Sequence, residues 1–160
     1  MSSDTKSELE VSVRLMTERD ISSVMKIERE AFSDPWSASA FEQQLREAGW
    51  GAIVAETDGK VIGYACYYIL DAESHLTNIA VASDYQRKSV AKRLLENILR
   101  VVTDQRCEFL LLEVRPSNTP AVAFYERYGF KLLYRRPHYY RKPLEDALVM
   151  VRYLEDDEKA

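Results

Sequence analysis

The chain has 160 residues, of which 46% are hydrophobic and 30% charged, and its formal net charge is −4 at pH 7. This length and composition indicate one soluble globular domain, large enough for a hydrophobic core. The acidic balance argues against general nucleic-acid binding. No apolar run approaches the roughly 20 residues of a membrane span, and the N-terminus lacks a secretory pattern. We therefore expect a cytoplasmic protein.

The first third of the chain predicts a strand followed by two helices. Residues 11–16 alternate in polarity as a strand does, and Thr17 stands where it can cap a helix with an apolar stripe. The segment 33–36 contains a proline and interrupts this helix. Ser37 can then cap a second helix.

The next part of the chain predicts three consecutive strands. Residues 52–57 and 60–70 flank an Asp58-Gly59 turn, which is a strong hairpin signal. A further turn at 71–73 leads to an apolar strand that begins near His75. We expect this strand to end before a basic, amphipathic helix at roughly 88–103.

The last part predicts a buried strand, a short helix and two more strands. Residues 107–114 form an almost unbroken apolar run, typical of a central strand. Asn118 and Pro120 begin a helix in the preferred order, and Gly129 ends it. Strands are then expected at 130–136 and 146–154, joined by a linker at 137–143. The predicted order is β-α-α-β-β-β-α-β-α-β-β.

The two cysteines, Cys66 and Cys107, lie in predicted strands without CxxC spacing. We expect buried, reduced thiols rather than a disulfide or a metal site. Neither cysteine stands at a predicted helix start or beside a histidine, so a cysteine nucleophile has little support.

The first candidate site is the joint at 86–91, where a strand turns into a helix through small residues. Such a joint directs several free backbone N–H groups at one point, and the helix dipole adds positive charge there. Phosphate is the usual ligand of such a site. An ordinary turn with a solvated basic face explains the joint by itself equally well.

The second and third candidates are Glu113 and Tyr125. Glu113 stands near the end of an apolar strand, where a carboxylate must be paired, solvated or shifted in pKa. An ion pair with Arg115 or another neighbour is one reading, and a general base is the other. Tyr125 lies in a short helix crowded with aromatic groups. Its hydroxyl is either satisfied in the core or faces a cleft as a proton donor.

Six collinear segments across residues 11–154 resemble the GCN5-related N-acetyltransferase (GNAT) family, and within it the RimI-type ribosomal-protein-alanine N-acetyltransferases. These segments are AFSDPWS (31–37), NIAV (78–81), DYQRKSVAKRLL (84–95), LEVRPSN (112–118), AVAFYERYGF (121–130), and HYY with EDA (138–140, 145–147). The resemblance implies one α/β domain at 11–154 with a mixed, mostly antiparallel sheet of about seven strands and helices on both faces. Residues 1–10 are expected to be disordered, and 155–160 form an acidic tail.

The resemblance also implies roles for individual residues, with acetyl-CoA as co-substrate and no metal. Glu113 matches the family's proton acceptor, acting through a water, and Tyr125 its proton donor. Trp36, Tyr139 and Tyr140 correspond to the walls of the acceptor slot. The residues implied to bind acetyl-CoA are Ile79, Ala80, Val81, Arg87, Lys88, Ser89, Val90, Ala91, Lys92 and Asn118.

One departure from the family pattern is Ser89, which stands where the family has glycine in its Gln/Arg-x-x-Gly-x-Gly/Ala joint. With a negative φ, serine fits, and its hydroxyl can add a phosphate hydrogen bond. A positive φ would cost on the order of 1 kcal/mol and weaken cofactor binding. We expect serine to be tolerated, because Glu113, Asn118 and Tyr125 are all present.

Three functions follow from these residues. The leading one is transfer of acetyl from acetyl-CoA to a protein N-terminal α-amine, with the N-terminal alanine of a small-subunit ribosomal protein as a candidate acceptor. A second keeps the fold but acetylates lysine side chains or a small amine. A third is an acyl-CoA-binding module without turnover, supported only by Ser89. No direct nucleic-acid or membrane partner is expected.

Overall fold

The structure is a computed structural model in which residues 9–154 are described. The acidic tail and most of the N-terminal segment predicted to be disordered lie outside these residues. The strands are β1 (Ser12–Leu15), β2 (Trp50–Thr57), β3 (Lys60–Leu70), β4 (Glu73–Val81), β5 (Phe109–Val114), β6 (Lys131–Arg141) and β7 (Leu144–Tyr153). The helices are α1 (Ile21–Ala31), α2 (Ala38–Arg46), α3 (Val90–Asp104) and α4 (Thr119–Arg127), with 3-10 turns at Glu18–Asp20 and Ser83–Tyr85.

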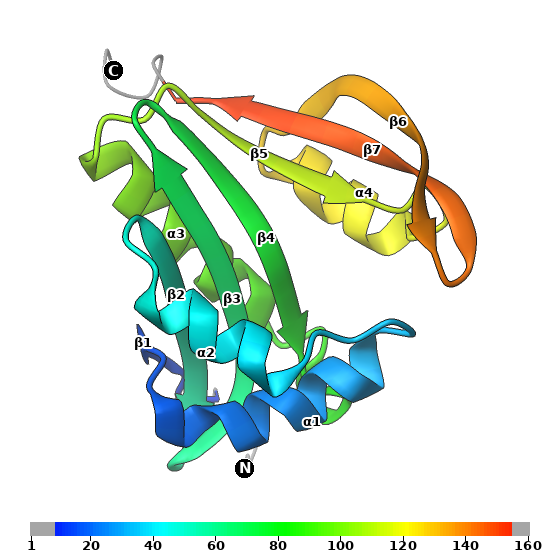
Figure 1. The fold of residues 1–160 in the computed structure, drawn as a ribbon. Helices are drawn as coiled ribbons and strands as arrows, with labels where there is room; N and C mark the ends of the chain where they lie inside the picture. The colour runs from blue at the N-terminus through cyan, green and yellow to red at the C-terminus, as the bar shows by residue number, and fades with distance from the viewer. Residues whose placement is uncertain (1–8, 155–160) are drawn as a thin grey trace, which may run out of the picture.

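The seven strands form one sheet in the order β1-β2-β3-β4-β5-β7-β6. Only the β4–β5 pair is parallel, and the other neighbours are antiparallel. This mixed, mostly antiparallel sheet and the order of helices and strands confirm the predicted fold class. Parallel neighbours need a crossover connection, and α3 supplies it between β4 and β5 (Figure 1).

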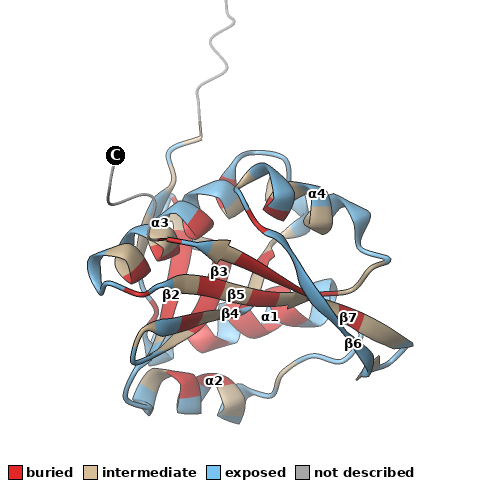
Figure 2. Ribbon diagram, turned by 90° about the horizontal axis from the view of Figure 1, so that it is seen from above, coloured by how far each residue is buried: buried red, intermediate tan, exposed pale blue. Residues whose placement is uncertain are grey.

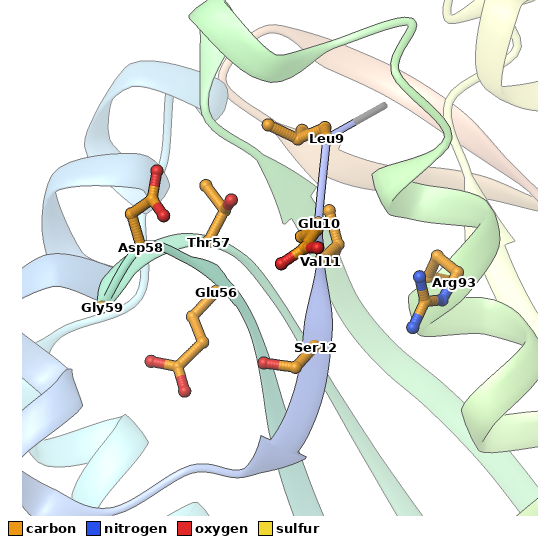
Figure 3. A pocket seen from close by; sticks show the side chains of 9 residues that line it. All are labelled: Leu9, Glu10, Val11, Ser12, Glu56, Thr57, Asp58, Gly59 and Arg93. Carbon is orange, nitrogen blue, oxygen red and sulfur yellow. The ribbon is translucent and has the colours of Figure 1, made fainter. Parts of the chain in front are cut away.

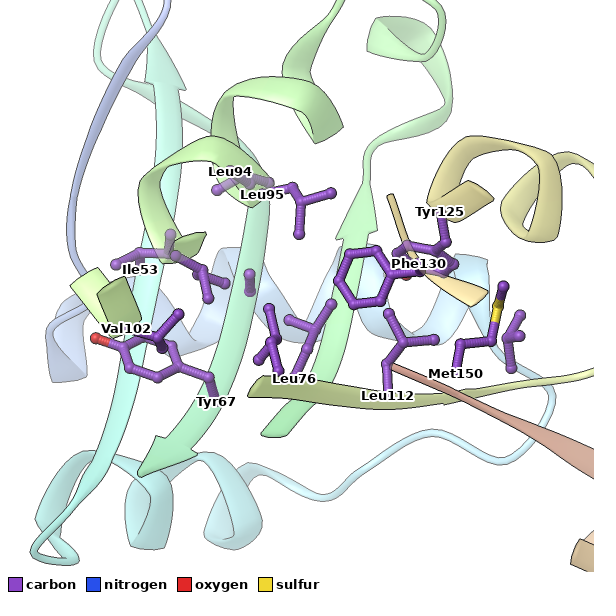
Figure 4. Packing of buried hydrophobic residues seen from close by; sticks show 14 of the residues in the cluster. Ile53, Tyr67, Leu76, Leu94, Leu95, Val102, Leu112, Tyr125, Phe130 and Met150 are labelled. Carbon is purple, nitrogen blue, oxygen red and sulfur yellow. The ribbon is translucent and has the colours of Figure 1, made fainter. Parts of the chain in front are cut away.

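Helices cover both faces of the sheet, as predicted (Figure 2). Helices α3 and α4 lie on one face over the larger core, which extends from Ile53 on β2 to Tyr125 and Phe130 near α4 (Figure 4). Helices α1 and α2 lie on the other face over a second core that includes Phe41 and Tyr64. Burial of these apolar side chains supplies most of the driving force for folding.

The ends of α2 and α4 follow the signals in the sequence, whereas Thr17, predicted to cap the first long helix, precedes the 3-10 turn Glu18–Asp20 and α1 begins only at Ile21. The Ser37 hydroxyl accepts from the backbone N–H of Ala40 at 3.1 Å, as expected for the predicted cap of α2. The Asn118 side-chain oxygen accepts from the N–H of Ala121 at 3.3 Å, and Gly129 has a φ of +88° just after α4. Both predicted ends of α4 are therefore confirmed.

Strands β4 and β5 diverge after a short parallel contact (Figure 1). They pair only between Glu73–Leu76 and Phe109–Leu112. In the β3–β4 ladder, Cys66 opposes Asn78 while Tyr67 opposes Leu76, so Thr77 is an extra residue in β4. Such a bulge bends its strand. The last residues of β4 therefore leave β5.

The predicted linker 137–143 is wrong, because β6 continues to Arg141. The pairing between β6 and β7 passes from Arg136↔Ala147 to Tyr140↔Glu145, so three residues of β6 bulge out opposite Asp146. Pro137 lacks a backbone N–H and His138 has a φ of +52°. The bulge accommodates both residues, and the N–H of His138 donates to the Asp146 carboxylate at 2.9 Å.

Candidate active site

The carboxylate of Glu113 lies near the end of β5, and its side chain is 13% exposed. Its Oε1 is 2.7 Å from Nε2 of His75 on β4, and its Oε2 is 3.9 Å from a guanidinium nitrogen of Arg136 on β6. The sequence allowed an ion pair with Arg115 or another neighbour, and the partner in the structure is Arg136 rather than Arg115. A half-enclosed carboxylate held between an imidazole and a guanidinium is positioned to accept a proton.

His75 is the main site residue that the sequence reasoning missed. Its Nδ1 lies 3.2 Å from the Tyr68 hydroxyl, so the imidazole connects Tyr68 to Glu113. The two rings also pack together, with centroids 5.2 Å apart. His75 opposes Leu111 in the parallel register, two residues before Glu113. A histidine within the apolar strand β4 was the available signal for a site residue. Its contact with Glu113 could not be predicted, because it depends on the register in which β4 and β5 pair.

Tyr139 and Tyr140 stand on β6 close to the same carboxylate. Burial, and then the charge of Glu113, raise the pKa of Tyr139, while Arg136 lowers it. Burial, Tyr139 and Glu113 raise the pKa of Tyr140 to about 12. Each ring has an arginine over its face, Arg136 on Tyr139 at 4.3 Å and Arg115 on Tyr140 at 4.2 Å. The two tyrosines therefore stay protonated at neutral pH and form one aromatic wall.

Arg115 holds the hairpin that carries these tyrosines. Its guanidinium donates to the carbonyls of Pro143 at 2.8 Å and Lys142 at 3.2 Å. It also pairs with Glu145 at 3.2 Å. Ser117 reinforces the same carboxylate through its N–H at 2.8 Å and its hydroxyl at 2.9 Å. The segment after β5 thus fixes the β6–β7 turn.

Tyr125 packs in the larger core with only 7% of its surface exposed. Burial, and then the neighbouring Tyr140, raise the pKa of Tyr125 well above its ordinary value. Its hydroxyl is therefore protonated at neutral pH and lies near Tyr140.

The joint at 86–91 contains two residues in the left-handed region. Arg87 has a φ of +62° and Ser89 a φ of +65°, and Ser89 is the residue immediately before α3. Of the two alternatives for Ser89, the structure therefore has the positive φ, which strains a residue that carries a side chain. Backbone turned in this way, next to a helix N-terminus, presents N–H groups to an anion. The joint can therefore hold a phosphate.

Gly63 on β3 allows α3 to begin close to the sheet. A Cβ at this residue would lie 3.2 Å from the Ala80 carbonyl oxygen and 3.2 Å from a methyl of Val90. Residues Ile79–Val81 pair with Ala65–Gly63 of β3 but not with β5. Their other edge is thus unpaired by the sheet. An extended ligand can pair with this edge and place its anionic end at the joint, which fits the chemistry of acetyl-CoA.

The loop between α1 and α2 forms the side of the site opposite the hairpin. The Ser33 hydroxyl donates to the Lys142 carbonyl in the β6–β7 turn. Trp36, predicted to line the acceptor slot, packs its ring against Phe41 with centroids 5.1 Å apart. Its backbone N–H donates to the Glu28 carboxylate at 2.9 Å. Ser33, rather than the Trp36 ring, makes the contact with the hairpin.

A cavity lies away from Glu113 and His75, between the β1 edge and α3 (Figure 3). It has a volume of about 530 Å³, and its lining includes Glu10, Glu56, Asp58 and Arg93. None of the residues predicted to be catalytic lines it. We therefore assign the candidate site to the region where β4 and β5 diverge. In the part of the chain that is described, no helix is long and apolar enough to cross a membrane.

Comparisons with known proteins give independent information on this fold and site. A model of the acetyltransferase (GNAT) family matches residues 21–130. The ribosomal protein bS18-alanine N-acetyltransferase of Escherichia coli is 34% identical over 133 residues, covering 82% of this chain and 89% of that protein. A crystal structure of the Escherichia coli ribosomal-protein-alanine N-acetyltransferase superposes with a TM-score of 0.84 at 30% identity, covering 91% and 94% of the two chains. An N-alpha-acetyltransferase of Sulfolobus acidocaldarius is 31% identical over 160 residues, covering 92% and 95%.

Proposed function

Because the chain belongs to the GNAT acetyltransferase family, we propose that it transfers the acetyl group of acetyl-CoA to the N-terminal α-amine of a protein. The acceptor suggested by the relatives is the N-terminal alanine of a small-subunit ribosomal protein. The observation that carries the proposal is the Glu113–His75 contact of 2.7 Å, located where β4 and β5 diverge. It provides a proton acceptor beside the unpaired β4 edge.

The first task of the site is to deprotonate the acceptor. An α-amine has a pKa near about 8, so much of it is protonated at neutral pH. Glu113 accepts this proton, through a water, while His75 and Arg136 orient its carboxylate. The free amine is then a competent nucleophile. Tyr139 and Tyr140 bound the slot that holds it.

The second task is to stabilise charge and to supply a proton to the leaving group. Acetyl-CoA supplies an activated thioester carbonyl when it is bound. A backbone N–H of the Ile79–Val81 edge donates to the carbonyl oxygen as negative charge develops there. The new C–N bond forms and the C–S bond breaks, Tyr125 gives its proton to the thiolate, and the proton that the attacking nitrogen loses on becoming an amide returns to Tyr125 through solvent. Tyr125 is protonated at neutral pH, so it holds the proton that the thiolate receives.

The cradle for the pyrophosphate is the joint of residues 87–92, and Asn118 contacts the arm of acetyl-CoA. Supporting the first assignment are the left-handed backbone at Arg87 and Ser89 and the N-terminus of the 15-residue helix α3. The Asn118 oxygen is used as a helix cap, which leaves its amide N–H₂ to donate. Proximity in this ternary complex lowers the barrier without a covalent enzyme intermediate.

The function is tested by mass spectrometry of an Ala-starting peptide incubated with acetyl-CoA. We expect α-acetylation, and we expect Glu113→Gln to lower kcat by roughly 100-fold or more, because the proton acceptor is lost. A peptide with a blocked N-terminus and one lysine serves as the control for side-chain acetylation. Absence of an α-acetyl product, or an unchanged rate in Glu113→Gln, would refute the proposal.

A further inference from the structure

Glu28 is a buried carboxylate that the proposed chemistry does not use. It lies on α1 with 1% of its surface exposed. Among the described residues, no lysine, arginine or histidine forms an ion pair with it. An ionised carboxylate in such a place is costly unless several donors satisfy it. Its donors come from three separate elements.

The first donor belongs to the acceptor side of the site. Glu28 Oε2 accepts from the backbone N–H of Trp36 at 2.9 Å. Residues 32–35 of this loop are exposed, so few contacts fix its path. Other contacts of the loop include the Trp36 ring on Phe41, the Ser33 hydroxyl on the hairpin and the Phe32 N–H on the Glu28 carbonyl. The bond to Glu28 therefore fixes the loop at the point where it returns to the protein.

The other donors belong to the side that faces acetyl-CoA. Glu28 Oε1 accepts from the Asn78 side-chain amide at 2.8 Å and from the Tyr64 hydroxyl. Asn78 is 9% exposed and directly follows the Thr77 bulge that bends β4 away from β5. Burial and the Glu28 charge raise the pKa of Tyr64 far above its ordinary value, so its hydroxyl remains a donor. One carboxylate oxygen thus holds the strand and the other holds the loop.

We propose that Glu28 is a positioning residue that couples the two substrate sites, because it fixes the acceptor loop and the unpaired end of β4 to the same carboxylate. When bound CoA holds the end of β4 in place, Glu28 also holds the acceptor loop in place. When a bound peptide holds the loop in place, Glu28 likewise holds the bent end of β4. This reciprocity is required of any coupling between two sites. The inference rests on the proposed function only in requiring that CoA and an acceptor peptide bind.

The substitution Glu28→Gln tests the two attachments of this side chain, one to the acceptor loop and one to β4. An amide has one oxygen and one N–H₂ group. If its oxygen faces Asn78 and Tyr64, its N–H₂ group opposes the N–H of Trp36, and the loop is released. In the flipped orientation Asn78 must turn its own amide and Tyr64 must accept, so neutral hydrogen bonds replace the stronger charged ones to the strand. Either orientation weakens one of the two attachments, so the coupling falls while most of the packing is kept.

Calorimetry of peptide binding with and without CoA tests the proposal, since CoA binds without turnover. In the wild type we expect CoA to tighten binding of an Ala-starting peptide by about five-fold or more. The ratio of the peptide Kd without CoA to the peptide Kd with CoA measures the coupling. In Glu28→Gln this ratio should fall towards one, and KM for the peptide should rise more than kcat falls. Asn78→Ala breaks only the link to β4 and should give the same loss.

Asp20→Asn is the matched control, because Asp20 is a second buried carboxylate in the same region and contacts Arg14 and Thr17 instead. This variant should lose stability but keep the wild-type ratio, and thermal denaturation verifies that each variant is folded. A wild-type ratio near one, or an unchanged ratio in Asn78→Ala and Glu28→Gln, would overturn the proposal. If the wild type neither binds CoA nor acetylates any peptide, the proposed function itself fails.

Discussion

His75 and Glu113 form a hydrogen-bonded pair at the place where β4 and β5 diverge. The imidazole lies between the Tyr68 hydroxyl and the Glu113 carboxylate, so its orientation is fixed at both nitrogens. Arg136 lies on the second carboxylate oxygen at a longer distance of 3.9 Å. One carboxylate oxygen is therefore shared with His75, and the other is held less closely.

Loss of His75 should slow the reaction without preventing substrate binding. A hydrogen bond to a charged group contributes about 1.5–3 kcal/mol, and each 1.4 kcal/mol or so corresponds to tenfold in rate. We expect His75→Ala to lower kcat by about 10-fold to 100-fold, with the Kd for CoA unchanged in calorimetry. Tyr68→Phe, which keeps the His75–Glu113 contact, is the control and should have a smaller effect. Equal losses in the two variants would contradict this assignment.

Ser89 carries a conformational cost at the cradle. A residue with a side chain pays roughly 1–2 kcal/mol in the left-handed region, whereas glycine pays mainly through the entropy of the unfolded chain. We expect Ser89→Gly to raise the free energy of unfolding by about 0.5–1 kcal/mol, measured by urea denaturation. It should also tighten CoA binding.

Ser23→Gly provides the matched control for this substitution. Ser23 is exposed within α1, where glycine costs roughly 0.5–1 kcal/mol. The two substitutions should therefore change stability in opposite directions. Destabilisation by both would mean that Ser89 is not strained in the folded protein.

The β6–β7 hairpin is held to the site by the segment that follows β5. Arg115 contacts two carbonyls of the turn, the Glu145 carboxylate and the Tyr140 ring. This arrangement uses the planar fork of a guanidinium, which an ammonium group cannot reproduce. Because the Ser33 hydroxyl contacts the same turn, the hairpin and the acceptor loop enclose the slot together.

Replacing Arg115 should loosen the acceptor side only. We expect Arg115→Lys to raise KM for the peptide by about 5-fold to 30-fold, because about 1–2 kcal/mol of contacts is lost, while the KM for acetyl-CoA is unchanged. Steady-state kinetics with each substrate varied in turn measures this difference. Arg135→Lys is the control, since the Arg135–Asp146 pair is exposed and such pairs contribute little. A parallel rise of both KM values would argue against a role confined to the hairpin.

Arg14 joins the edge strand β1 to the start of α1 and to the neighbouring strand β2. Arg14 on β1 contacts Asp20 at 2.8 Å and Glu56 on β2 at 3.0 Å. The hydrogen bond from Arg14 is the main cause that lowers the pKa of Asp20 below its model-peptide value of 3.8. A carboxyl with a lowered folded-state pKa stabilises the fold above its unfolded pKa, and this contribution is lost as the pH falls through the folded value.

The acid stability of the protein should therefore depend on Arg14. We expect Arg14→Gln to lower the free energy of unfolding by about 1.5–3 kcal/mol at pH 7. The difference from the wild type should shrink as the pH falls below about 4, because Asp20 becomes protonated. Urea denaturation at a series of pH values measures this. A difference that stays constant down to pH 2 would exclude Asp20 as its source.

Local signals in the sequence were sufficient for the elements of this fold. The Asp58-Gly59 turn, the caps at Ser37 and Asn118 and the glycine at 129 act within a few residues, so their effects can be read without a structure. Glu113 and Tyr125 were recognisable as candidates by residue type and family resemblance. The linker at 137–143 was misassigned, because a bulge opposite Asp146 requires knowledge of the partner strand.

The order of the elements, the apolar faces that form the two cores and the small-residue joint before α3 all follow from local patterns in the sequence. Which polar side chains meet depends on the tertiary fold. His75 reaches Glu113 because β4 and β5 pair in one particular register, and Glu28, which continues the apolar stripe of α1, meets Trp36 and Asn78 across two other elements. The sign of φ at Ser89 was open for the same reason. Local propensities act along the chain, whereas these contacts depend on strand register and bending, which the packing of the whole domain sets.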